Sequence, residues 1–352
     1  MVNILAGDIG GTKTLLSLYS LKANQLEPLA SERYGSAAWD DLAPMVRHFL
    51  ARAGPAARHP DVACFAVAGP VQSGQARLTN LPWRLSEADL SARCEIKTVE
   101  LVNDFAVLIY GLPHLSAHQR APIRSGQTVG GEPVLILGAG TGLGVAIGIP
   151  GPEGLRAVAS EAAHGSFAPR SEREWELREW LQHDLQLERV SIERVVSGTG
   201  LGHTARWLLD RYNHAGDHPL TPIALSWQNT ALGSERDDLP AAVARAAGQG
   251  DALAAEALDI WLAAYGAVVG DLALTCLSRG GIWLAGGTAA KMLTELRSEV
   301  FSGAFLDKGR LRETLEPLSI QAVIDPALGS FSAACRARIL LGSSAMDLDP
   351  NR

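Results

Sequence analysis

The residues best suited to chemistry begin with a glycine-rich turn near the N-terminus. Gly7-Asp8-Ile9-Gly10-Gly11-Thr12 lies between two apolar runs, Val2 to Ala6 and Thr14 to Tyr19, which we predict to form a hairpin. Glycines let the backbone approach a ligand closely, so the N–H groups of such a turn can reach phosphate oxygens. The carboxylate of Asp8 would repel phosphate unless Mg²⁺ lies between them. A plain hairpin with a turn-stabilising Asp is the alternative.

The same plan recurs in the middle of the chain. Val134 to Leu137 leads into Gly138-Ala139-Gly140-Thr141-Gly142, and Leu143 to Ile149 continues as a second strand. Because an apolar strand follows this turn where a dinucleotide fingerprint requires a helix, a dehydrogenase is disfavoured, and no GxxxxGK[ST] phosphate loop occurs. The repetition indicates a duplicated architecture with two anion-binding turns. Residues 7–12 are called the first glycine turn below, and residues 138–142 the second.

A pair of polar residues follows a predicted buried strand at Asn103 and Asp104. The apolar run Lys97 to Val102 predicts the strand, and open α/β sheets place ligand chemistry at the carboxyl ends of their strands. Asn103 is suited to donate to a hydroxyl group, and Asp104 to accept the proton of an attacking one. An Asx cap for the segment Phe105 to Tyr110 is the alternative for this pair.

Three further side chains have the chemistry of hydroxyl recognition. Glu161 and His164 are three residues apart, so one face of a helical turn would present them together. Glu193 precedes Val195 to Gly200, which we predict to be strand and turn. Carboxylates, amides and imidazoles form the hydrogen bonds that distinguish sugar hydroxyls. A metal site at Glu161 and His164 is the alternative, but the sequence indicates no third ligand.

The elements that position these residues alternate between strands and helices, which indicates an α/β fold. A chain of 352 residues exceeds what one hydrophobic core supports, so we expect two domains with a cleft between them. A third glycine pair, Gly286-Gly287, follows the apolar strand Ile282 to Ala285 and precedes a helical run from Ala289. Helical spacing is present in four segments: Ala43 to Ala53, Ser86 to Arg93, Arg173 to Gln186 and Ala252 to Ser278. Val62 to Ala68 is predicted to be a buried strand. Loops are predicted at His214 to Thr221 and at Ser234 to Pro240.

The composition excludes several classes of protein. The net charge of −7 disfavours a nucleic-acid partner, which requires a basic surface. The four cysteines are far apart in the sequence and form no zinc motif. The most apolar segment, Ile260 to Gly270, is flanked by Asp259 and Asp271 and is shorter than the roughly 20 residues that cross a bilayer, so we predict a buried helix there. The N-terminus has no signal-peptide pattern, which favours a cytoplasmic protein.

Taken together, these segments resemble the bacterial glucokinase family of the hexokinase, heat-shock-protein-70 and actin superfamily. The matching landmarks follow the family's order: GDIGGTK at 7–13, LTNLPW at 78–83, NDF at 103–105, GAGTGLGVA at 138–146, SEAAHGSFAP at 160–169, ERVVSGTGL at 193–201, LAGG at 284–287 and DKGR at 307–310. The resemblance implies a two-lobed, actin-like ATPase (ribonuclease-H-like) α/β fold with a cleft between a smaller and a larger domain. Its implied division is 1–114 plus 326–342 for the small domain and 115–325 for the large domain, with 343–352 as a tail.

The resemblance also implies a reaction and a set of residue roles. The reaction is ATP-dependent phosphorylation of the 6-hydroxyl of glucose to glucose 6-phosphate, the first step of glucose use in glycolysis, with a broader hexose or amino-sugar kinase as the alternative. Asp104 would be the catalytic base, and sugar hydroxyls would contact Thr79, Asn80, Asn103, Asp104, Glu161, His164 and Glu193. ATP would contact Asp8, Gly10, Gly11, Thr12, Gly140, Thr141, Gly142, Gly286 and Gly287, with Gly286 and Gly287 bordering the adenosine. Asp8 would hold Mg²⁺ through water, and the protein would be a cytoplasmic homodimer with no nucleic-acid or membrane partner.

The chain departs from the family pattern in two places. Ala162-Ala163 stands where many relatives have Gly-Gly, which bears on sugar preference, and Lys13 stands where many have Asn. Lys13 is shared with the related repressor, open-reading-frame and kinase (ROK) family, but the cysteine-rich zinc motif usual in that family is missing. A sugar-responsive DNA-binding regulator would need a helix-turn-helix, for which no room precedes Gly7. A chaperone or filament protein would lack the hydroxyl-binding set.

Overall fold

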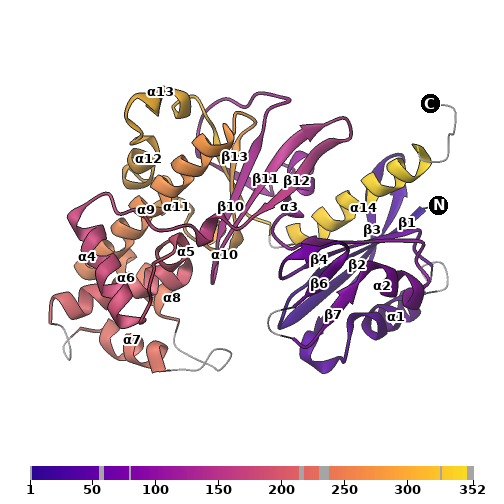
Figure 1. Ribbon diagram of the computed structural model, residues 1–352, viewed down its shortest axis with the longest axis horizontal. Helices are drawn as coiled ribbons and strands as arrows, with labels where there is room; N and C mark the ends of the chain where they lie inside the picture. Colours follow the sequence, from indigo (N-terminus) through magenta and orange to yellow (C-terminus); the bar gives the residue numbers. More distant parts are fainter. Residues whose placement is uncertain are drawn as a thin grey trace. The chain divides into compact units, whose positions relative to one another are not determined.

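The computed structural model describes residues 2–54, 59–78, 81–213, 218–229, 238–325 and 327–346 (Figure 1). The chain forms two compact units. Unit 1 comprises Met1–His118, Ala146–Ala159 and Asp325–Arg352, and unit 2 comprises Gln119–Val145 and Ser160–Ile324. Residues 146–159, which the predicted division assigned to the large domain, thus group with unit 1 by compactness, and the predicted division itself remains a prediction.

Unit 1 is built on a five-stranded sheet in the order β3-β2-β1-β4-β8. β1 pairs antiparallel with β2, as the predicted hairpin requires, and parallel with β4, which pairs parallel with β8. The carboxyl ends of β1, β4 and β8 therefore meet at one edge of the sheet. The strands are β1 (Val2–Ile9), β2 (Lys13–Lys22), β3 (Gln25–Gly35), β4 (Val62–Val67) and β8 (Thr98–Asn103), with a small separate sheet of β5 (Val71–Gln72), β6 (Gln75–Arg77) and β7 (Arg84–Ser86).

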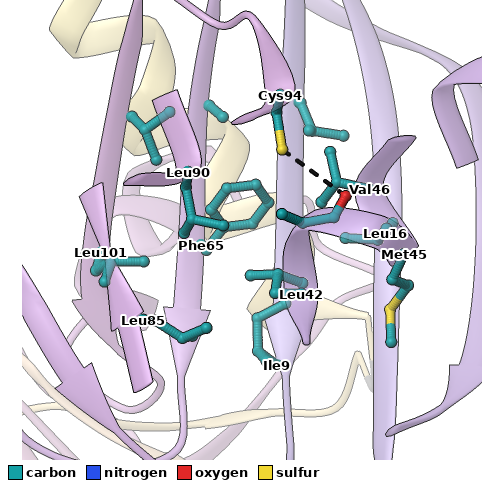
Figure 2. Close-up of a cluster of buried hydrophobic side chains, with 14 of the residues drawn as sticks. Ile9, Leu16, Leu42, Met45, Val46, Phe65, Leu85, Leu90, Cys94 and Leu101 are labelled. Atoms are coloured by element: carbon teal, nitrogen blue, oxygen red, sulfur yellow. Dashed lines mark hydrogen bonds between the residues drawn. The ribbon is translucent and has the colours of Figure 1, made fainter. Parts of the chain in front are cut away.

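The side chains of β1 alternate between two apolar clusters, because successive residues of a strand face opposite sides of the sheet. Leu5 and Ile9 belong to an apolar cluster that also contains residues of α1 and α2. Figure 2 shows part of this cluster, with Ile9, Phe65 and Cys94 labelled. Ile4 and Ala6 belong to the other cluster, with residues of α14. The helices of unit 1 are α1 (Leu42–Arg52), α2 (Glu87–Cys94), α3 (Leu108–Gly111) and α14 (Leu328–Met346), and η1 (Ser36–Ala38) and η3 (Leu112–His114) are 3-10 turns.

Unit 2 contains most of a second sheet, in the order β12-β11-β10-β13-β14-β9. The strands are β9 (Arg120–Arg124), β10 (Val134–Ala139), β11 (Leu143–Gly151), β12 (Gly154–Ser160), β13 (Ile282–Ala285) and β14 (Ile320–Val323). The helices are α4 (Glu172–Asp184), α5 (Ile192–Val195), α6 (Gly198–Arg211), α7 (Leu220–Asn229), α8 (Leu239–Gly248), α9 (Ala252–Cys276), α10 (Gly286–Lys291), α11 (Leu293–Leu296), α12 (Glu299–Leu306) and α13 (Arg312–Leu315), with 3-10 turns η4 (Ala162–His164) and η5 (Gly309–Leu311).

The longest helix, α9, is the core helix of unit 2. It is long and apolar enough to cross a membrane by length and composition, but 67% of its most apolar window is buried inside the protein. Trp261 and Tyr265 are fully buried, and their rings lie 5.3 Å apart. The predicted buried helix at Ile260 to Gly270 is confirmed.

Two predictions about local structure are wrong. Residues 195–200 do not form a strand and turn, because α5 ends at Val195 and Ser197 caps α6, its hydroxyl accepting a hydrogen bond from the Gly200 N–H. Gly198 and Gly200, which were predicted to form a turn, lie in the first turn of α6. The loops predicted at 214–221 and 234–240 are shorter than expected, since α7 begins at Leu220 and α8 at Leu239; residues 214–217 and 234–237 lie outside the described residues.

Candidate functional site

The first glycine turn is held by its carbonyl groups. The Ser36 hydroxyl donates to the carbonyl of Gly10 at 2.8 Å, and the Ser36 N–H donates to the carbonyl of Thr12 at 3.0 Å. The Gly10 N–H donates to the carbonyl of Lys13, and a Cβ at position 10 would lie 2.9 Å from that oxygen, which explains the glycine. Within the described residues the N–H groups of Gly11 and Thr12 have no acceptor. The turn thus keeps donors available for an anion.

Asp8 adds a carboxylate beside this turn. It lies on β1 opposite Ala66 of β4, one position before the end of the strand. Burial raises the pKa of the Asp8 carboxyl above its ordinary value, and the nearby Arg33 guanidinium opposes the shift. Because no described residue forms a hydrogen bond or ion pair with this carboxylate, a hydrated cation would supply the missing positive charge. A single buried carboxylate without a hydrogen-bond partner has the chemistry to hold Mg²⁺ through water, and this role of Asp8 remains a prediction.

The second glycine turn is held in the same way from α6 and α10. Its carbonyl groups accept hydrogen bonds from the Thr288 hydroxyl at Ala139, the Gly198 N–H at Gly140 (2.7 Å) and the Thr199 hydroxyl at Thr141 (2.8 Å). Among the described residues, the N–H groups of Thr141 and Gly142 have no acceptor. Both turns therefore direct carbonyl oxygens into the protein and leave N–H groups for a ligand, which is the arrangement that binds phosphate.

Glu193 lies against the second turn. Its carboxylate accepts a hydrogen bond from the Leu143 N–H at 3.0 Å, and a Cβ at Gly142 would collide with it. In this structure Glu193 therefore braces the second turn, a contact that the sequence did not indicate. Its predicted contact with a sugar hydroxyl remains a prediction.

Glu161 and His164 lie at the two ends of η4, Glu161 as its N-cap residue and His164 as its last residue. The Nε2 atom of His164 is 3.7 Å from Oε2 of Glu161, and both side chains are more than half exposed. Neither Ala162 nor Ala163 has a positive φ, so alanine fits this backbone without strain despite the departure from Gly-Gly. The segment is joined to α5 by the hydrogen bond from the Ile192 N–H to the Gly165 carbonyl, so it lies close to Glu193 in the chain's tertiary structure.

Asn103 and Asp104 lie at the end of β8, where the sequence predicted them. The Asn103 side chain accepts hydrogen bonds from the N–H groups of Phe105 and Ala106 and so forms an Asx turn. It is not the helix cap that the sequence suggested, because α3 begins at Leu108 with Val107 as its N-cap residue. Its amide nitrogen donates to the Gly69 carbonyl at 3.1 Å and to Oδ1 of Asp104 at 3.2 Å. Both amide hydrogens are thereby engaged, and the carboxylate of Asp104 is oriented by its neighbour. A sugar hydroxyl would have to replace one of these acceptors to bind Asn103.

Substitution of Asn103 separates these two roles. We expect Asn103→Asp to keep the Asx turn, since a carboxylate accepts the same N–H groups, but to lower kcat about tenfold because the donor to Asp104 is lost. Asn103→Ala should lower kcat similarly and also destabilise unit 1 by about 1 kcal/mol, since the hydrogen bonds of the turn are lost. Steady-state kinetics and thermal unfolding of both variants measure this. Normal kcat in the Asp variant would show that Asn103 does not orient Asp104.

A cavity of about 390 Å³ lies beside the second turn, entirely within unit 2. Its lining includes Thr141, Gly142, Ser197, Thr199, His203 and Trp227. The rings of His203 and Trp227 meet edge to face, 5.2 Å apart. Gly286 adjoins the same turn, since a Cβ there would lie 3.2 Å from the Ala139 carbonyl, and its φ of +85° favours glycine.

The predicted residues thus fall into two groups. Asp8, Gly10, Gly11, Thr12, Asn103 and Asp104 lie in unit 1, whereas Gly140, Thr141, Gly142, Glu161, His164, Glu193, Gly286 and Gly287 lie in unit 2. Thr79 and Asn80 lie outside the described residues. Sequence reasoning missed Ser36, Thr199 and Thr288, the hydroxyl donors that hold the turns. In the sequence, each of these three residues directly follows a glycine, and no other pattern pointed to them.

The family model and the sequence relatives agree on one family. The family model described as Glucokinase matches residues 5–339. A glucokinase from Synechocystis sp. is 40% identical over 351 residues, covering 96% of this chain and 98% of the relative. The crystal structure of a glucokinase from an Antarctic psychrotroph has a TM-score of 0.80 at 27% identity and covers 96% of this chain and 99% of its own. A ROK family glucokinase from Streptomyces griseus, in complex with glucose and AMPPNP, shares the fold, with a TM-score of 0.61 at 20% identity, 96% of this chain and 99% of its own.

Proposed function

This chain belongs to the glucokinase family, and from that premise we propose that it transfers the γ-phosphoryl group of ATP to the 6-hydroxyl of glucose. The match over residues 5–339 carries the proposal, because it contains both glycine turns and the Asn103–Asp104 pair. The fold is the predicted actin-like kinase fold. A broader hexose or amino-sugar kinase remains the alternative.

The proposed mechanism relies on positioning. Phosphoryl transfer has a loose transition state in which charge spreads over the phosphoryl oxygens, so the base mainly orients the attacking hydroxyl. Asp104, oriented by Asn103, would accept the proton of the 6-hydroxyl. The N–H groups of Gly11, Thr12, Thr141 and Gly142 would bind phosphate oxygens. Mg²⁺, held near Asp8 through water, would supply positive charge to the phosphates.

We further propose where the two substrates bind. The cavity beside the second turn would hold the nucleoside of ATP, with Gly286 and Gly287 at its border, because it adjoins the phosphate-binding N–H groups and contains aromatic rings. Glu161, His164 and Glu193 would contact sugar hydroxyls together with Thr79, Asn80 and Asn103. The Streptomyces griseus structure, solved with glucose and AMPPNP, supports this pair of ligands for the fold.

The remaining proposals follow from family membership alone. We propose that the protein is a cytoplasmic homodimer, requires Mg²⁺, and acts at the entry of glucose into glycolysis.

A substrate panel tests the proposed function. The purified protein is assayed for ADP release with glucose, mannose and glucosamine, and with ATP, ADP or polyphosphate as donor. Mass spectrometry and ³¹P NMR of the product identify the phosphorylated oxygen. We expect glucose 6-phosphate from glucose and ATP. Preference for an amino sugar would favour the alternative, and phosphorylation of none of the sugars would overturn the enzymatic proposal.

A further inference from the structure

The first turn of α14 contacts the carboxylate of Asp8. Gly329 is the second residue of this helix, and a Cβ added there would lie 2.7 Å from Oδ2 and 3.1 Å from Cγ of Asp8. Both residues belong to unit 1. The three atoms nearest to that position all belong to Asp8, so the Asp8 side chain lies in the space that a side chain at position 329 would need.

The sequence pattern explains why these two elements meet. Asp8 lies on the same face of β1 as Ile4 and Ala6, since alternate residues of a strand share a face. Ile4 and Ala6 pack in the cluster that contains Ala333, Ala334 and Ala337 of α14. The face of the sheet that α14 covers therefore carries Asp8 near the end of β1. Figure 1 shows α14 against this sheet. The packing of this small-residue surface fixes how closely the first turn of the helix approaches the carboxylate.

The glycine is not required by the backbone. Gly329 lies in the first turn of α14 and has no positive φ, so alanine fits this backbone without strain and is the better helix former. The same helix has a second glycine, Gly342, whose added Cβ would meet nothing within 4 Å. An added Cβ would therefore meet Asp8 at position 329 and open space at position 342.

We propose that Gly329 is a positioning residue for the carboxylate of Asp8, and that its missing side chain sets the direction in which this carboxylate faces the cation of the bound nucleotide. The inference rests on the proposed function, because it deepens the role of Asp8 in binding Mg²⁺ and ATP. A methyl group at position 329 displaces the movable end of a short side chain and leaves the backbone unchanged. The substitution therefore alters nucleotide binding more than it alters folding.

The experiment uses calorimetric titration of ATP at several Mg²⁺ concentrations, with thermal unfolding of the same samples without metal. Gly329→Ala is compared with the control Gly342→Ala. We expect Gly329→Ala to weaken Mg²⁺-dependent ATP binding about tenfold, the effect of holding one side chain away from its rotamer, without lowering Tm. Gly342→Ala should bind as the wild type does. Equal binding by both variants, or a loss of binding accompanied by a large fall in Tm, overturns the proposal.

A double-mutant cycle shows whether Gly329 acts through Asp8. In the Asp8→Ala background the methyl group at position 329 meets no carboxylate, so Gly329→Ala should have no further effect on ATP binding and should raise Tm without metal through its helix propensity. Additive effects on binding would refute the coupling. If the wild type phosphorylates no sugar, the proposed function fails; if it is active and the cycle is additive, only this inference fails.

Discussion

Replacement of Asp104 by asparagine is expected to lower kcat by about 10²- to 10⁴-fold, the usual range for a group that moves a proton in the transition state. The amide keeps an oxygen that can accept the hydrogen bond from Asn103, so the end of β8 should retain its conformation. It cannot accept the proton of the attacking hydroxyl. ATP should still bind, because the N–H groups of both glycine turns are unchanged.

Single-turnover kinetics and ATP titration together measure this expectation. Asp89→Asn is a suitable control, since Asp89 is a half-exposed carboxylate of the same unit that pairs with Arg93 on α2. Asp104→Glu should recover only a small part of the activity, because the longer side chain moves the carboxylate away from the Asn103 amide. Near-normal turnover of the Asn variant would remove Asp104 from the role of base.

Replacement of Glu193 by alanine is expected to lower kcat/KM by about 10- to 100-fold, as a charge-assisted hydrogen bond and a brace of the second turn are lost together. The Leu143 N–H loses its acceptor, and Gly142 gains space in which the turn can move. Because Glu193 touches the turn directly, ATP binding should weaken even when no sugar is present. This result distinguishes the brace from a role in sugar binding alone.

Two variants complete the comparison. Glu193→Gln retains an oxygen that can accept from Leu143 and should bind ATP better than the alanine variant. Glu188→Ala removes an exposed carboxylate nearby in the sequence and should behave as the wild type does. If Glu193→Ala changed only the KM for glucose, the brace would be irrelevant to nucleotide binding and the predicted sugar contact would account for the residue.

The strongly apolar elements followed from the sequence. The strands β1, β10 and β13 were predicted from short continuous apolar runs, and the helix α9 from a long apolar segment with helical spacing. β3 was not predicted, since most of its residues are exposed and show no apolar alternation. α6 was misread because its first residues include Gly198 and Gly200. Local preference disfavours a helix there, but the Ser197 cap and the hydrogen bond from the Trp261 indole to the Ser197 carbonyl fix its start.

The residue types of the site also followed from the sequence, since glycine turns, an Asn-Asp pair and a Glu/His pair each suit one kind of chemistry. Only the tertiary structure decided how each is held. Ser36 meets the first turn, and Thr199 and Thr288 meet the second, across separations that no local pattern encodes. The same holds for Glu193 at Gly142 and for Gly329 at Asp8. Side-chain chemistry is a local property of the sequence, whereas the partner of a carbonyl group or a carboxylate depends on which distant segments the fold packs together.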